Sequence, residues 1–125
     1  MAGVPLKKLR QWFGHSRLVR VMPNTPMTVG RGAAAFCCDS EVTEADRRFV
    51  EELFDTVGIA VPMKEQHMDA ATALSGSGPA YVFEFIRVLV EGAVDLGLPG
   101  EQALRLAVQT IAGAAEMLRQ GCGTP

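Results

Sequence analysis

Two long helical stretches near the C-terminal end constrain this chain most, because their apolar surface is too wide for one small core. In residues 79–97 the charged side chains fall three and four residues apart on a single stripe, and nearly all other positions are apolar or small; the stripe comprises Glu84, Arg87, Glu91 and Asp95. Residues 101–119 repeat this pattern. A surface helix usually shows an apolar band of only a little over about 100°. We therefore expect both stretches to be buried against a second subunit.

The residues before these helices predict alternating strands and helices. From apolar periodicity and from proline and glycine positions we expect, in order, helix 5–13, strand 17–22, strand 33–38, helix 43–57 and strand 59–63. Thr43 can cap the second helix, and Gly58 ends it. The predicted fold class is therefore α/β followed by all-α, with a boundary near residues 64–75 that divides a domain 1–64 from a domain 65–125.

Composition excludes several classes of protein. Of the 125 residues, 48% are hydrophobic and 21% charged, which is typical of a globular domain. A net charge of −2 gives no basic surplus for nucleic acid, and no apolar run is long enough to span a membrane. Three cysteines, two of them adjacent, make a poor disulfide framework, so we expect reduced thiols in a cytoplasmic protein.

Residues 75–79, Ser-Gly-Ser-Gly-Pro, are the first candidate binding motif. Gly76 and Gly78 let a ligand or a neighbouring chain approach the backbone closely, while Ser75 and Ser77 supply hydroxyl groups. Free N–H groups at the start of the following helix favour an anion. A simple helix-to-helix turn with serine caps remains the alternative, and the spacing is not that of a phosphate-binding P-loop.

Three further positions carry polar groups that could meet a ligand. Residues 23–26, Pro-Asn-Thr-Pro, form a stiff loop after a predicted strand, where ligands of open α/β sheets bind, although an ordinary turn at the end of a strand is the alternative. Glu65 begins a helix and could accept a hydrogen from a ligand's amine, or could only complement the helix end. Thr72 either faces the same ligand or bonds within its helix. No nucleophile, general acid–base set or metal cluster emerges, so no catalytic residue and no metal ligand are predicted.

Taken together, three segments resemble the pyrroline-5-carboxylate reductase family in order and spacing, and the resemblance covers essentially the whole chain. They are Arg20-Val-Met-Pro-Asn-Thr-Pro26, Asp69-Ala-Ala-Thr-Ala-Leu-Ser-Gly-Ser-Gly-Pro-Ala-Tyr81, and Gly97-Leu-Pro99 together with Gln109-Thr-Ile-Ala-Gly-Ala-Ala-Glu-Met-Leu118. The resemblance implies the C-terminal part of a Rossmann-like domain that binds NADPH or NADH, joined to the start of a helical dimerisation domain. It also implies hydride transfer to pyrroline-5-carboxylate, which gives proline, and a homodimer or higher homo-oligomer through helices 79–97 and 101–119.

The same resemblance assigns roles to residues. It implies cofactor contacts by Ala2, Pro23, Asn24 and Thr25. It implies substrate contacts by Glu65, Ser75, Gly76 and Ser77, and we add Thr72 to this set.

Two parts of the family pattern are not found among these residues. They are the Gly-x-Gly-x-x-Gly phosphate loop and the Ser-Pro-Gly-Gly-Thr-Thr segment. We therefore expect the central piece of such a reductase, with doubtful activity by itself. A non-catalytic dimerisation module and a related reductase acting on another small acid remain alternatives.

Overall fold

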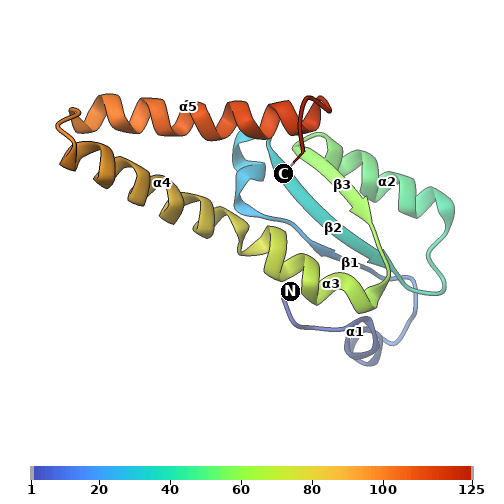
Figure 1. Cartoon of the computed structure of the whole chain (residues 1–125). Coiled ribbons are helices and arrows are strands. Elements are labelled where there is room, and N and C mark those ends of the chain that lie inside the picture. Colours follow the sequence, from blue (N-terminus) through green and yellow to red (C-terminus); the bar gives the residue numbers. More distant parts are fainter. Residues whose placement is uncertain (1, 125) are drawn as a thin grey trace. The chain divides into compact units, whose positions relative to one another are not determined.

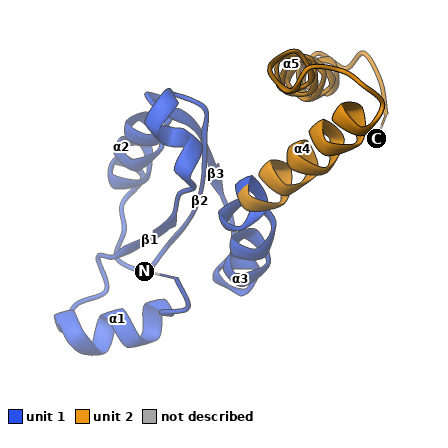
Figure 2. Ribbon diagram, turned by 90° about the vertical axis from the view of Figure 1, so that its left-hand side faces the viewer, with its two compact units in different colours: residues 1–79 blue, residues 80–125 orange. Residues whose placement is uncertain are grey.

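The computed structural model describes residues 2–124. It divides into two compact units, one ending at Pro79 and one beginning at Ala80, which are coloured separately in Figure 2. The first unit is α/β and the second is helical, as expected from the sequence.

A sheet of three strands organises the first unit (Figure 1). The central strand β2 (Gly32–Cys38) pairs antiparallel with β1 (Val19–Met22) and parallel with β3 (Gly58–Pro62). A parallel pair needs a crossover between its strands. The helix α2 (Glu44–Asp55) supplies this crossover between β2 and β3.

Strand β2 is buried on both faces, which explains its run of small apolar residues. Successive strand side chains point to opposite faces. On one face, Ala35 and Cys37 pack with Leu6 and Met68 in the core cluster. On the other face Phe36 is completely buried. A strand covered on both sides is apolar throughout rather than alternating, as the sequence indicated.

The first helix, α1 (Leu6–Phe13), ends where glycine permits it. Gly14 has a left-handed φ of 72°, and its N–H donates to the carbonyl of Arg10 at 2.9 Å. The Arg10 guanidinium also forms a bidentate ion pair with Asp39, which follows β2. The helix is thereby fastened at one end to the sheet.

Helix α2 begins with the predicted cap. The Thr43 hydroxyl accepts the Asp46 N–H at 3.2 Å, and the Asp46 carboxylate accepts the Thr43 N–H at 3.0 Å. Arg17 also donates two hydrogen bonds to Asp46 and, as the largest cause, lowers the pKa of that carboxyl. The apolar side chains of α2 are only partly covered, since Phe49 and Leu53 remain exposed among the described residues.

Near the end of the first unit the helical geometry changes three times. Glu65 was expected to begin a helix. It begins instead a 3₁₀ turn (Glu65–His67), which is followed by one turn of α3 (Met68–Ala71) and a π-helical turn (Thr72–Gly76). The expected Pro-Asn-Thr-Pro loop is also tighter than predicted, because a second 3₁₀ segment (Thr25–Val29) begins inside it.

The second unit consists of α4 (Gly78–Asp95) and α5 (Gly100–Arg119), close to the predicted bounds. Large apolar side chains remain exposed on both helices; they include Tyr81, Phe83, Phe85, Val88, Leu104, Leu106, Val108 and Met117. The apolar bands predicted for these two helices are therefore still largely exposed among residues 2–124. No helix formed by residues 2–124 has the length and apolarity needed to cross a membrane.

Gly58 is a position in the sheet where the neighbouring strand leaves no room for a side chain. Its φ is 158°, and a Cβ there would lie 2.0 Å from the Gly32 carbonyl oxygen in the neighbouring strand. We expect Gly58→Ala to lower the free energy of unfolding by about 3 kcal/mol or more. Urea unfolding followed by the fluorescence of Trp12, the one tryptophan, measures this.

Gly14→Ala is the matched control, because Gly14 has a left-handed φ but no atom within 4 Å of an added Cβ. Its cost should be only the backbone strain, about 1–2 kcal/mol. Equal losses in the two variants would show that the contact with Gly32 is unimportant.

Candidate functional site

Asn24 joins the two segments that the sequence singled out as binding motifs. Its side-chain oxygen accepts the Ala33 N–H at 2.8 Å, and its side-chain nitrogen donates to the Ser75 carbonyl at 3.1 Å. One amide therefore ties the loop after β1 both to β2 and to the turn before α4. Because the oxygen and one amide hydrogen are already bonded, Asn24 holds the site together more than it offers groups to a ligand.

The turn at residues 72–76 is π-helical, a geometry found frequently at functional sites. The Ser77 N–H closes the wide turn on the Thr72 carbonyl at 3.0 Å. The hydroxyl groups of Thr72 and Ser75 donate to the carbonyls of Met68 and Ala71, at 2.8 and 2.9 Å. These two hydroxyls can therefore only accept from a ligand, whereas the half-buried Ser77 hydroxyl has no hydrogen-bond partner among residues 2–124.

Gly76 packs against the end of β1. A Cβ at this position would lie 2.8 Å from the terminal methyl group of Met22. Met22 is also among the side chains packed on the core cluster. The glycine therefore permits a close approach between the turn and the strand, as its place in the motif suggested.

Glu65 lies at the start of its 3₁₀ turn and is only partly exposed. Its Oε1 accepts the N–H of Leu6, the first residue of α1, and lies 3.7 Å from Nη1 of Arg20. The sequence offered two roles for this carboxylate, ligand contact or helix-end contact. The structure shows a helix-end contact, but with α1 rather than with its own helix.

Arg20 is a buried charge that sequence reasoning did not single out. Its side chain is 6% exposed, and its guanidinium reaches Asp69 at 3.0 Å as well as Glu65. A charged residue flanked by Val19 and Val21 in a predicted strand was the available signal. Buried charges are almost always paired, so this pattern could have prompted a search for its carboxylate partners.

The remaining predicted residues are less engaged. Thr25 is exposed and Pro23 half-buried, both beside Asn24. Ala2 lies in an exposed turn, and no hydrogen bond joins it to residues 23–25 within the described part of the chain. The structure thus joins the 23–25 loop to the 75–77 turn through Asn24.

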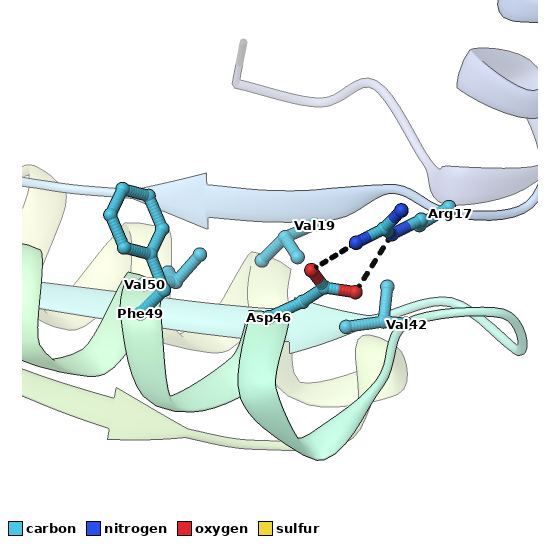
Figure 3. Close-up of a pocket in the computed structure, with 6 residues that line it drawn as sticks. All are labelled: Arg17, Val19, Val42, Asp46, Phe49 and Val50. Carbon is cyan, nitrogen blue, oxygen red and sulfur yellow. Dashed lines mark hydrogen bonds and ion pairs between the residues drawn. The ribbon is translucent and has the colours of Figure 1, made fainter.

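A separate hollow of about 240 Å³ lies between the start of β1 and α2 (Figure 3). Its apolar wall comprises Val19, Val42, Phe49 and Val50, and at its rim Arg17 and Asp46 neutralise each other. None of the predicted binding residues lines it. Its paired charges and open apolar wall do not indicate any particular ligand.

Comparison with known proteins gives this geometry a context. Residues 65–125 match the family described as pyrroline-5-carboxylate reductase dimerisation. The chain is similar to the crystal structure of a Plasmodium falciparum pyrroline carboxylate reductase with NADP bound, with 42% identity and a TM-score of 0.88 over 94% of this chain and 47% of that one. A 1-pyrroline-5-carboxylate reductase from Streptococcus pyogenes gives a TM-score of 0.93 at 31% identity, over 99% of this chain and 48% of that one.

Sequence comparison agrees. Pyrroline-5-carboxylate reductases of Arabidopsis thaliana and Pisum sativum are 48% and 46% identical, over 94% and 93% of this chain and 42% of each relative. The chain thus spans less than half the length of the curated relatives it matches. With family, fold and sequence in agreement, the chain belongs to the pyrroline-5-carboxylate reductase family.

Proposed function

We propose that this chain forms part of an NAD(P)H-dependent enzyme that reduces 1-pyrroline-5-carboxylate to L-proline. The observation that carries the proposal is the connection made by Asn24 between the loop after β1 and the turn before α4. Through this connection the loop after β1 contacts the first part of residues 65–125, which match the pyrroline-5-carboxylate reductase dimerisation family. Relatives along nearly the whole chain are named for this reaction.

The residues present fit one wall of a nicotinamide site. Pro23 and Thr25 lie on a loop that Asn24 holds rigidly after β1, and the Thr25 side chain is exposed. Rigid loops at the carboxyl ends of strands are where cofactors of α/β folds bind. A similar structure contains NADP, which supports assigning this loop to the cofactor. When bound, the reduced nicotinamide supplies the hydride, and these residues orient it.

The chain's own polar groups then act on the imine. Protonation of the ring nitrogen makes the neighbouring carbon a better hydride acceptor. Glu65 would stabilise this protonated form by accepting its N–H. Ser77, whose hydroxyl is unpaired among the described residues, would donate to the substrate carboxylate beside the turn formed by Ser75 and Gly76. Thr72 and Ser75 would shape this wall, since their hydrogens are already donated within the helix.

The family match also supports a homodimer through helices 79–97 and 101–119. Their exposed apolar side chains, such as Phe83 and Leu106, would be covered by the same helices of a second copy. The family model begins at residue 65, which favours a domain boundary between residues 64 and 65. The three free cysteines favour the reducing cytoplasm.

Glu65→Gln tests the substrate contact. In the protein that carries this sequence, NADPH oxidation should depend on pyrroline-5-carboxylate. The substitution should lower kcat/KM for the imine by about 10- to 100-fold, the loss expected for a hydrogen bond to a charged group. Glu101→Gln, at the exposed start of α5, is the control and should change nothing. Absence of imine-dependent oxidation in the unsubstituted protein would refute the proposed function.

Phe83→Asp tests the proposed interface. A charge on the apolar face of α4 should convert the oligomer into monomers at micromolar concentration, measured by light scattering after size exclusion. Val29→Asp places the same charge on an exposed residue of the first unit and should leave the oligomer intact. If both variants, or neither, dissociated, the helices would not be the specific contact.

A further inference from the structure

Arg20 is a charged residue buried within the described part of the chain, and the proposed reaction does not use it directly. It lies in β1 opposite Cys37 of β2 and on the same face of the sheet as the core cluster. Removing a guanidinium from water is costly unless its charge is balanced nearby. The groups that balance it therefore have their positions fixed by the fold.

The charge is balanced from the helical segment and not from the sheet. Burial, the largest cause, raises the pKa of Cys37 to about 11, so the adjacent thiol is neutral at physiological pH. The two carboxylates that reach Arg20 are Asp69, at 3.0 Å from Nη2, and Glu65, at 3.7 Å from Nη1. Asp69 is highly exposed, whereas Glu65 is partly covered.

The two oxygens of Glu65 have different surroundings. Oε1 accepts the Leu6 N–H and faces Arg20, so two groups from two different elements hold it. Oε2 accepts no hydrogen bond from any residue from 2 to 124. If the carboxylate turned so that neither oxygen met the Leu6 amide, that N–H would lose its acceptor and Arg20 would keep only its pairing with Asp69.

We propose that Arg20 is a positioning residue that holds Oε1 of Glu65 against α1, so that Oε2 alone is presented to the cationic nitrogen of the substrate. This inference rests on the proposed function, because it assigns the orientation of the group that meets the imine. Arg20 itself does not contact substrate. Its planar fork spans both carboxylates at once, and a lysine ammonium at the same position could not.

Kinetics of Arg20→Lys provide the first test. The variant should raise KM for the imine about tenfold, as expected for a misplaced charged contact, while KM for NADPH and kcat change less than twofold. The double variant Arg20→Lys with Glu65→Gln should have the same KM for the imine as Glu65→Gln alone, because both changes remove the same contact between Glu65 and the substrate. Asp69→Asn is the matched control: it removes the other carboxylate and leaves Glu65 in place.

If the effects of the two substitutions were additive in the double variant, Arg20 would only stabilise the fold. Equal rises in KM for the imine and KM for NADPH would mean the same, and either result would overturn the proposal. The Leu6 amide gives a second readout that needs no activity. Its hydrogen exchange, followed by NMR, should accelerate about tenfold or more in Arg20→Lys and remain unchanged in Asp69→Asn. An unchanged rate in Arg20→Lys overturns the proposal even if the protein reduces no imine.

A third measurement uses the unsubstituted protein and so does not depend on a variant that folds. Proline, the product of the proposed reaction, should shift the Glu65 side-chain carboxyl resonance while the Leu6 amide keeps its protection from exchange. Loss of that protection on adding proline would show that Oε1 turns to the ligand, which contradicts the proposal. Failure of imine-dependent NADPH oxidation refutes the proposed function separately.

Discussion

A positive charge buried in strand β1 is the constraint on which the rest of the first unit depends. Because Arg20 is surrounded by apolar groups and a neutral thiol, it requires carboxylates, and Asp69 and Glu65 supply them from the helical segment that follows the sheet. Glu65 in turn binds the first amide of α1. One buried group thereby fixes α1, β1 and the start of the helical domain relative to one another.

Strand β1 and the loop that follows it also hold the turn at the proposed active site. Two residues beyond Arg20, Met22 packs against Gly76, and after two more Asn24 bonds the Ser75 carbonyl. The turn before α4 is therefore held from one side by β1 and the loop that follows it. Large apolar side chains of α4 and α5, such as Phe83 and Leu106, remain exposed in the described part of the chain, which is why the proposed function includes a second copy.

Apolar periodicity and the positions of glycine and proline predicted much of the fold. The strand around Phe36, the cap at Thr43 and the two long helices follow from local residue patterns, and the structure confirms them. The π-helical turn was not foreseen, because its wide hydrogen bond from Ser77 to Thr72 depends on how the turn packs against β1. The roles of Glu65 and Asn24 were left open for the same reason, since each is set by a partner distant in the sequence.

The sequence by itself determined the order of elements, the change from α/β to all-α and the family, because these depend on spacing along the chain. Only the tertiary structure decided which polar groups are already used. Asn24 holds two segments together, Thr72 and Ser75 donate within their own helix, and one oxygen of Glu65 accepts the Leu6 N–H. Hydrogen bonds between residues some fifty positions apart leave no periodic signal, so only the folded chain reveals them.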